Sequence, residues 1–502
     1  MEPLTLVSLK PAASECLLAG SLLILLVAGV IRGNGMTPFL MRMVAFLAAL
    51  VALILYAMPH DTVTLFGGMF VSDRFAVFVK IIVAAGLALN CALASRYLRE
   101  EGLDRFEYPI LMLTSVLGMF LMISANHLML LYVGLELQSL SLYVLASFRR
   151  NSSLSAEAGL KYFILGALSS GMLLFGISLV YGFTGTLSYT DIAPTVAGLT
   201  GGSLTGVLFG LVFILSGLAF KVSAVPFHMW TPDVYEGSPT SVTAFFAMVP
   251  KLAAMALIVR LLSGPFGSVM PQWQVVVIFL SVASMLWGAF AGLVQSNVKR
   301  LMAYSSIGNM GYALLGVVIG TQAGYAAAFY YMTIYMVMVG GVFAVLMYMR
   351  RDGMSHKSIE DFAGLSKTHP KLAYAMAILM FSLSGIPPMA GFFGKLFIFQ
   401  VVVAQGMYAI AVIGVLTSVV AAYYYLRIIK VMFFDAETDP YNAAQSRGRQ
   451  AVLGFAVVFA LLFIFIPTRL LNEANRATTS LGGVVVNTHI STSEDDSELL
   501  GY

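Results

Sequence analysis

Four ionisable side chains lie inside stretches of the chain that are otherwise apolar, namely Glu136, Lys221, Lys251 and Lys395. Only 10% of the 502 residues are charged, whereas 59% are hydrophobic. A charged side chain at the centre of a bilayer costs about 3 kcal/mol on insertion scales, so residues of this kind mark ion pathways and proton relays by default. Carboxylates and amines take up and release protons. We therefore predict that these four residues form a proton- or ion-conducting row.

Glu136 and Lys251 lie far from the ends of their apolar stretches. Glu136 is about eight residues, or roughly 12 Å, into its predicted helix, next to Gln138 and Ser139. One interpretation is a protonated glutamate that hydrogen-bonds a neighbouring helix, and the other is a titrating site in an ion path. Lys251 is about twelve residues into its predicted helix, too central to reach either membrane surface.

Lys221 and Lys395 lie next to residues that break helices. Pro226 follows Lys221 by five residues, and Lys395 ends the segment SGIPPMAGFFGK. Proline removes a backbone donor and clashes with the preceding turn, so we predict a broken helix at each place. Broken helices inside membranes line wet cavities, although each lysine could instead reach the interface. Lys80 begins only about five residues into its span, and we expect it to reach the interface.

Candidate relay groups lie near this row: His228, Tyr304, Ser305 and Ser306. Histidine titrates near neutral pH and could relay protons, but a structural role for His228 at the predicted break is an equal alternative. Asp233 and Glu236 follow in the same segment. We interpret these two as solvated or loop-capping residues rather than catalytic ones.

Repeated apolar runs of about 20 residues predict an all-α polytopic membrane protein, because each such run can cross about 30 Å of hydrocarbon. A membrane barrel would instead show alternating runs of about ten residues. The runs predict about fourteen helices, near residues 14–31, 38–58, 75–95, 108–125, 128–147, 158–184, 203–225, 239–263, 273–294, 299–319, 322–348, 372–403 with a break, 407–432 and 451–471.

Lysine and arginine alternate between the predicted loops. Nineteen fall in or beside the odd-numbered loops and only five in the others, which are Lys10, Arg74, Arg260, Arg469 and Arg476. Because basic loops stay in the cytoplasm, this predicts cytoplasmic odd loops and both termini in the periplasm. The net charge of +4 is then mostly a matter of topology, and no nucleic-acid partner is needed to explain it.

The sequence predicts no cofactor or metal bound by this chain. Cys16 and Cys91 are the only cysteines, far apart and each in an apolar run, so they form no metal-ligand set. No GxGxxG follows a predicted strand, and no Walker-type motif is present. The last dozen residues are polar and acidic, and we predict a disordered tail there.

Four segments carry a specific resemblance: LYVGLELQSL around Glu136, PFHMWTPDVYEGSPTSVTAFFAMVPK from Pro226 to Lys251, NVKRLMAYSSIGNMGY from Asn297, and SGIPPMAGFFGK around Lys395. They resemble the subunit N family of antiporter-like membrane subunits in proton-pumping NADH:quinone oxidoreductase, respiratory complex I, the counterpart of mitochondrial subunit 2. The resemblance covers about residues 110–430. The first forty residues and the tail carry no recognisable motif.

The two helix breaks suggest an internal duplication with two inverted five-helix repeats, because LSGLAF before Lys221 loosely echoes LSGIPP before Lys395. The resemblance implies the corresponding antiporter-like fold with two broken helices. It divides the chain into three N-terminal helices (1–107), a first repeat (108–263), a second repeat (264–432), and a last helix with the polar tail (433–502). The resemblance also implies roles in proton transfer. Glu136 pairs with Lys221, Lys251 connects this pair to the next part of the path, and Lys395 lies near the proton exit.

The sequence does not by itself separate a bacterial inner membrane from an organelle membrane, but the absence of a transit peptide and the chain length favour the bacterial membrane. The partners that the resemblance implies are a neighbouring antiporter-like subunit, small membrane subunits and phospholipid. FMN, iron–sulfur clusters and quinone are expected in other subunits of the complex. The implied function is proton translocation coupled to quinone reduction elsewhere in the complex.

Two other functions stay open on the sequence. A subunit of a multisubunit sodium/proton antiporter would share the fold, and it would respond to a sodium gradient rather than to NADH. A purely structural membrane anchor would tolerate replacement of Lys251 by alanine. The segment from Pro226 to Lys251 favours the redox-driven proton pump.

Overall fold

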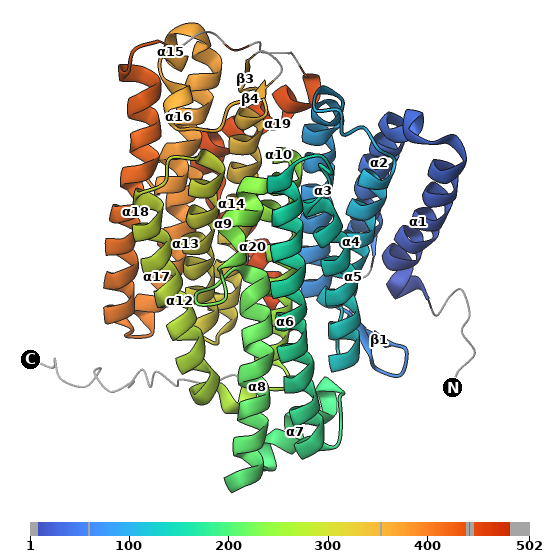
Figure 1. The fold of residues 1–502 in the computed structure, drawn as a ribbon. Coiled ribbons are helices and arrows are strands. Elements are labelled where there is room, and N and C mark those ends of the chain that lie inside the picture. Colours follow the sequence, from blue (N-terminus) through green and yellow to red (C-terminus); the bar gives the residue numbers. More distant parts are fainter. Residues whose placement is uncertain (1–8, 59–60, 352–353, 438–440, 442–445, 482–502) are drawn as a thin grey trace, which may run out of the picture.

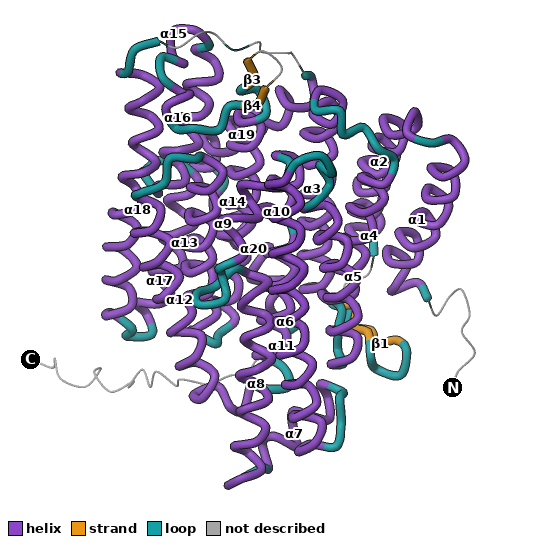
Figure 2. The backbone as a smooth tube through the Cα atoms, in the orientation of Figure 1, coloured by secondary structure: helices purple, strands orange, loops and turns teal. Residues whose placement is uncertain are grey.

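Long helices whose axes lie roughly side by side make up most of the molecule (Figures 1 and 2). The computed structural model describes residues 9–58, 61–351, 354–437, 441 and 446–481. The predicted polar tail lies outside the described residues. All statements below about this structure refer to the described part of the chain.

The helices follow one another with short connections. The first ten are α1 Ala13–Arg32, α2 Thr37–Ala57, α3 Arg74–Glu100, α4 Glu107–Ile123, α5 Leu128–Ala146, α6 Ser153–Thr184, α7 Tyr189–Gly198, α8 Gly201–Val222, α9 Trp230–Gly237 and α10 Thr240–Met248. The others are α11 Pro250–Ser263, α12 Met270–Leu293, α13 Val298–Val318, α14 Gln322–Leu346, α15 Leu365–Thr368, α16 Pro370–Ser384, α17 Ala390–Ala404, α18 Tyr408–Phe434, α19 Arg447–Leu462 and α20 Pro467–Thr478.

Strands are confined to two short antiparallel hairpins. One joins α2 to α3 and consists of β1 Val63–Leu65 and β2 Phe70–Ser72. The other follows α14 and consists of β3 Arg350–Arg351 and β4 Met354–Ser355. Five single 3-10 turns lie at helix ends, at Lys10–Ala12, Asn34–Met36, Gly267–Val269, Glu360–Phe362 and Phe463–Phe465.

The all-α membrane architecture predicted from the sequence is confirmed. Twelve helices in the described residues are long and apolar enough to cross a bilayer. The predicted number of fourteen is not confirmed, because α4 has 17 residues and α16 and α17 have 15 residues each. Fourteen crossings would require α4 to cross and α16 and α17 to cross together as one interrupted span.

Both predicted helix breaks are present. After Lys221, α8 ends at Val222 and Ser223 adopts a left-handed φ of 62°. The carbonyl of Phe220 accepts hydrogen bonds from the Trp230 indole at 2.9 Å and from the Ser223 amide at 3.1 Å, which ties α9 to the end of α8. The second break separates α16 from α17 and begins at Gly385, whose φ is 88°.

Three local features were not predicted. Val249 and Pro250 interrupt the expected helix 239–263, so that Lys251 stands at the start of α11. The short helix α7 lies between the predicted helices 158–184 and 203–225, where no helix was predicted. The predicted helix 451–471 is wrong at its end: α19 stops at Leu462 and α20 begins at Pro467. Proline is well suited to the first turn of a helix but not to its interior.

Close glycine contacts bring pairs of helices together. Gly118 of α4 faces Gly134 of α5, where an added Cβ would lie 2.7 Å from the Gly134 carbonyl oxygen. Gly288 of α12 faces Gly308 of α13 in a similar way, with 2.5 Å to the Gly308 nitrogen. Small residues permit this backbone approach, which drives helix association in lipid. The first two helices of each predicted repeat thus share one kind of contact.

The centre of the bundle is formed by α10, α11, α13 and α14. The window that identifies Thr240–Ser263 as a span is 100% buried, whereas that of Lys10–Arg32 is 28% buried. The outer helices turn apolar residues outward, including Ile24 of α1, Phe279 of α12 and Val419 of α18. Lys251 and the serines of α13 therefore lie where the protein, not lipid, surrounds them.

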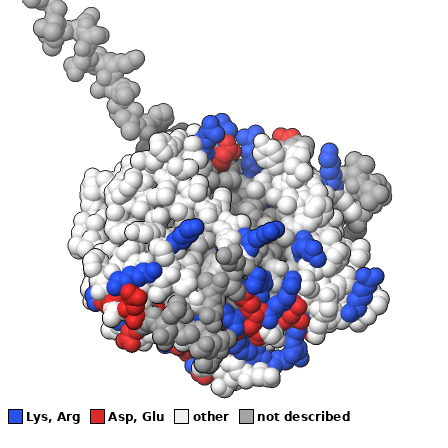
Figure 3. Space-filling view, turned by 90° about the horizontal axis from the view of Figure 1, so that it is seen from above, with Lys and Arg blue, Asp and Glu red and all other residues white. Residues whose placement is uncertain are grey.

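Basic residues gather at one end of the bundle. Figure 3 looks onto the end that carries α15 and the β3–β4 hairpin and shows Lys and Arg together with Asp and Glu. Glu100 at the end of α3 forms ion pairs there with Arg449 at the start of α19 and with Arg350 of β3. Three of the predicted odd loops therefore meet on the same face.

Candidate functional site

Lys221 contacts helix α5 at the break between α8 and α9. Its Nζ donates hydrogen bonds to Ser139 Oγ at 2.8 Å and to Tyr143 Oη at 3.2 Å. The lysine is 4% exposed. The alternative in which Lys221 reaches the interface is therefore excluded, because two hydroxyl groups inside the bundle bind its amine.

Glu136 lies on α5 one turn before Ser139 and is half-buried. One of its carboxylate oxygens, Oε1, is buried and has no hydrogen-bond partner among the described residues. No direct ion pair joins Glu136 to Lys221 in that part of the chain. Ser139, rather than the carboxylate, is the group on α5 nearest to the amine by hydrogen bonding.

Lys251 points from the start of α11 toward α13. Its Nζ donates a hydrogen bond to Ser306 Oγ at 2.6 Å, and the lysine is 1% exposed. The amine also lies 5.3 Å from the ring centroid of Tyr235, close enough for a cation–π contact. The hydroxyls of Tyr235 and Tyr335 are buried without a hydrogen-bond partner in the described residues. Among the described residues, Lys251 thus contacts a serine hydroxyl and an aromatic ring and forms no ion pair with a carboxylate.

A hydrogen-bonded cluster begins at Ser305, the residue of α13 next to Ser306. Ser305 Oγ and Tyr425 Oη are 2.6 Å apart. The amide of Asn309 donates to Ser305 at 3.2 Å and accepts from the hydroxyl of Tyr331 at 2.6 Å. We call these four residues the Asn309 cluster. Three hydroxyls and one amide from α13, α14 and α18 are thereby linked.

Lys395 lies at the second break. Its Nζ donates to the carbonyl oxygen of Ser384 at 3.0 Å and to Ser418 Oγ at 2.8 Å. Gly385 makes this approach possible, because an added Cβ would lie 3.1 Å from Lys395 Cδ. The free carbonyls at the end of α16 therefore solvate the amine, as expected of a discontinuous membrane helix.

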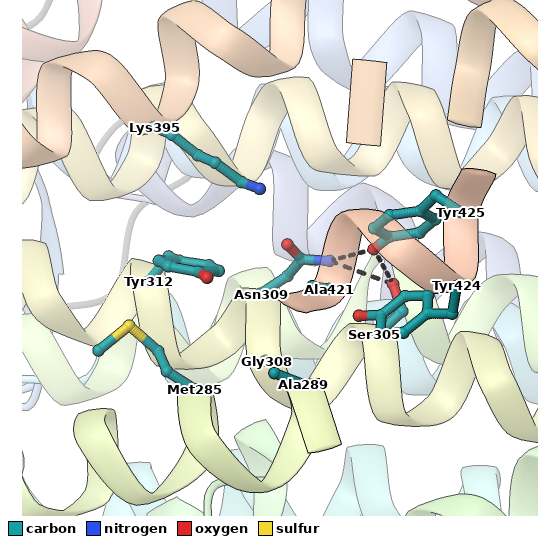
Figure 4. A pocket seen from close by; sticks show the side chains of 10 residues that line it. All are labelled: Met285, Ala289, Ser305, Gly308, Asn309, Tyr312, Lys395, Ala421, Tyr424 and Tyr425. Carbon is teal, nitrogen blue, oxygen red and sulfur yellow. Dashed lines mark hydrogen bonds between the residues drawn. The ribbon is translucent and has the colours of Figure 1, made fainter. Parts of the chain in front are cut away.

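A small cavity joins Lys395 to the Asn309 cluster (Figure 4). Lys395, Ser305, Asn309 and Tyr425 all line it, and its volume is about 10 Å³. That is about the space one water molecule requires. In Figure 4 the Lys395 amine points toward the side of the cavity where Asn309 and Tyr425 lie.

The predicted relay residues separate into two groups. Ser306 bonds Lys251, and Ser305 belongs to the Asn309 cluster and lines the cavity beside Lys395. His228 is half-buried and packs edge-on against Trp287, with ring centroids 5.8 Å apart, and no hydrogen bond in the described chain joins it to Lys221 or Lys251. Tyr304 is half-buried, one turn after Arg300, and makes no side-chain hydrogen bond to the described residues. The structure thus does not bring His228 or Tyr304 into the row.

Asp233 and Glu236 lie on α9 and form ion pairs rather than loop caps. Asp233 binds Lys161 at 2.7 Å and Arg300 at 2.6 Å. Glu236 binds Arg300 at 3.1 Å. These partly exposed pairs tie α6 and α13 to the second half of the broken helix.

Two buried ion pairs were missed by sequence reasoning. Lys80 Nζ lies 2.5 Å from Glu15 Oε1 and 2.6 Å from Ser124 Oγ, and Lys80 is 1% exposed. The expectation that Lys80 reaches the interface is therefore wrong. Arg260 forms two hydrogen bonds with Asp73, at 3.0 and 2.9 Å. The partners are 65 and 187 residues apart in sequence, and no local pattern connects them.

The described residues contain no group of three or more His, Cys, Asp or Glu side chains arranged to hold a metal ion. Cys91 is buried and Cys16 is exposed, and both are free. The charged row is thus built from amines, one carboxylate and hydroxyl groups.

The fold and the buried row define an antiporter-like membrane subunit. Residues 125–421 match the family model described as NADH:quinone oxidoreductase/Mrp antiporter, TM. A chain of respiratory complex I from Thermus thermophilus superposes with a TM-score of 0.77 at 32% identity, covering 91% of this chain and 98% of that chain. A chain of the Mrp complex from Dietzia sp. DQ12-45-1b superposes with a TM-score of 0.83 at 22% identity, covering 95% and 98% of the two chains, which shows the fold alone.

One curated relative narrows this class. NADH-quinone oxidoreductase subunit N of Rhodospirillum rubrum is 51% identical over 476 residues, which is 94% of this chain and 97% of the relative. The chain belongs to the family of NADH-quinone oxidoreductase subunit N.

Proposed function

We propose that this chain translocates protons as a membrane subunit of NADH:quinone oxidoreductase. Protons move along Glu136, Lys221, Lys251 and Lys395, driven by quinone reduction elsewhere in the complex. The observation that carries this proposal is that three buried lysine amines, each bonded to hydroxyl or carbonyl oxygens, lie at helix interruptions within one bundle.

The first step concerns Glu136 and Lys221. A unit charge about 8 Å away contributes about 2 kcal/mol at an effective dielectric near 20. A charge that arrives from a neighbouring subunit and draws Glu136 away from Lys221 would therefore destabilise the lysine's proton substantially. Ser139 follows Glu136 by three residues on α5 and accepts a hydrogen bond from the amine.

The second step crosses α13. Lys251 bonds Ser306, and the adjacent Ser305 bonds Tyr425. Hydroxyl groups donate and accept at once, so they can pass a proton on. The amide of Asn309 holds these hydroxyls in place without carrying the proton itself. The row thereby reaches the cavity beside Lys395.

The last step passes through that cavity. A water molecule held between the Asn309 cluster and Lys395 would link Tyr425 to the amine. Ser418 and the carbonyls at the end of α16 would hold the charged amine after it receives the proton. Lys395 is accordingly the terminal group of the row in this chain.

A sodium/proton antiporter subunit is the second candidate function. The likeness to the Mrp complex chain supports the fold but not the activity. Inverted membrane vesicles distinguish the two functions: NADH addition should acidify vesicles that hold the assembled complex, and a quinone-site inhibitor should abolish this. Acidification driven only by an imposed sodium gradient would favour the antiporter.

The membrane location, the topology, the two repeats and the placement of the cofactors belong to the same proposal. We place the chain in a bacterial inner membrane, with the basic end of the bundle in the cytoplasm and both termini in the periplasm. Residues 108–263 and 264–432 form the two inverted repeats, which matching glycine contacts support. Redox chemistry, with FMN, iron–sulfur clusters and quinone, takes place in other subunits.

A further inference from the structure

We propose that a groove between α2, α3 and α20 binds a phospholipid with an anionic headgroup. The groove has a volume of about 580 Å³ and combines two arginines with an apolar wall. Its volume is in the range typical of sites for small organic ligands. The groove lies apart from the buried row, so the lipid site and the proposed function can fail independently.

The charged end of the groove suits a phosphate group. Arg74 is the first residue of α3, is exposed, and forms no ion pair within the described chain. Arg476 of α20 lies opposite and binds Glu473 at 2.9 Å. Two guanidinium groups against one carboxylate leave a net positive charge. Guanidinium groups bind phosphate oxygens in a bidentate manner. A phosphate between the two arginines would give Arg74 an ionic partner.

The wall of the groove suits an acyl chain. Val77, Phe78 and Ile81 follow Arg74 at three, four and seven residues, so all four share one face of α3. Because the helix rises 1.5 Å per residue, Ile81 lies about 10 Å along the helix from the arginine. Tyr56 near the end of α2 borders the same groove, as tyrosines do at membrane interfaces. Charge at one end and apolar surface below it match a headgroup above its chain.

The groove opens at the depth of the headgroups. Helix α20 packs against the first turns of two membrane helices. Ser480, just after α20, accepts a hydrogen bond from the Phe75 amide of α3 at 3.1 Å, and Gln322 at the start of α14 bonds Asn475 at 3.0 Å. The arginines therefore lie where α3 enters the membrane. A free phosphate ion would use only this end of the groove and leave the wall uncovered.

Photocrosslinking in the intact complex tests this site. The complex is reconstituted with phosphatidylglycerol that carries a diazirine in one acyl chain, and labelled peptides are mapped after illumination. We expect label on α3 near Phe78 and at least fivefold less in the double variant Arg74→Gln/Arg476→Gln. Glu473→Gln should raise the labelling, because it frees Arg476. Arg469→Gln, an exposed position on α20 outside the groove, is the matched control and should change nothing.

A comparison of two lipid headgroups and a check of assembly on blue-native gels complete the test. Phosphatidylcholine with the same labelled chain should react weakly and equally in wild type and double variant, and the gels should show that every variant assembles. Equal labelling by both lipids would overturn the proposal. So would loss of labelling in the presence of millimolar inorganic phosphate, which indicates a free-anion site, or crosslinks from this face to a neighbouring subunit instead of lipid.

Discussion

Ser305 and Ser306 are consecutive residues of α13, yet their hydroxyls bond partners on different helices. Ser306 accepts a hydrogen bond from Lys251 at 2.6 Å, and Ser305 lies 2.6 Å from the hydroxyl of Tyr425. Tyr425 in turn lines the cavity next to Lys395. Helix α13 therefore contacts both Lys251 and the cluster that lines the cavity beside Lys395.

Replacing Ser306 by alanine should slow proton transfer out of Lys251. The variant removes the hydroxyl that binds the amine, and hydrogen bonds to charged groups contribute about 1.5–3 kcal/mol. We expect a drop of about tenfold or more in NADH-driven proton uptake by inverted vesicles. Ser306→Thr keeps a hydroxyl and should retain most of the activity. Equal rates in both variants would remove Ser306 from the path.

Replacing Tyr425 by phenylalanine should impair pumping while leaving the fold intact. The ring stays in place, but the hydroxyl that bonds Ser305 and lines the cavity is lost. Proton uptake at a fixed rate of NADH oxidation is the measurement, and a severalfold reduction is expected. Tyr330→Phe is the matched control, since that buried hydroxyl has no partner in the described chain. A similar reduction in both variants would point to packing rather than proton transfer.

Gly385→Ala should displace Lys395. Residue 385 has a φ of 88°, where a side chain costs about 1–3 kcal/mol, and the new Cβ would also press on the lysine. We expect assembled complex with reduced pumping, measured on purified complex in proteoliposomes. Gly406→Ala provides the comparison, because Gly406 has a φ of 72° but open space around its Cα. Equal effects at the two positions would mean that strain alone is responsible.

The buried pair of Glu15 and Lys80 should show strong coupling in a double-mutant cycle. Removing one partner leaves an uncompensated charge and costs about 3–5 kcal/mol, whereas removing both should cost much less. Thermal unfolding of the assembled complex with Glu15→Gln, Lys80→Met and both substitutions gives the coupling. For the exposed pair of Lys367 and Glu437, a cycle should give less than about 1 kcal/mol. Additive effects of the Glu15 and Lys80 substitutions would argue against a direct interaction.

The helices and their breaks could be predicted because both signals are local. Apolar runs set the spans, and Pro226 and the segment before Lys395 set the interruptions. The charges Lys221, Lys251 and Lys395 could be found for the same reason, since each stands out against its apolar neighbours.

The partners of those charges could not be predicted, because they come from distant elements. Tyr425 bonds Ser305 across 120 residues, and Lys221 reaches Ser139 across 82. Serines and tyrosines are also common in membrane helices, so nothing in the sequence marks these particular ones. Lys80 was misjudged because its partner Glu15 lies on another helix, near the start of α1.

The proton-to-electron ratio of the complex with Lys221→Met tests the central claim most directly. Methionine keeps the apolar stem of the side chain but removes the amine that Ser139 and Tyr143 bind. Lys367→Met, at an exposed lysine, serves as the control. We predict an assembled complex that still oxidises NADH but moves fewer protons per electron, while the control matches wild type. A normal ratio in the Lys221→Met complex would contradict the proposed proton row.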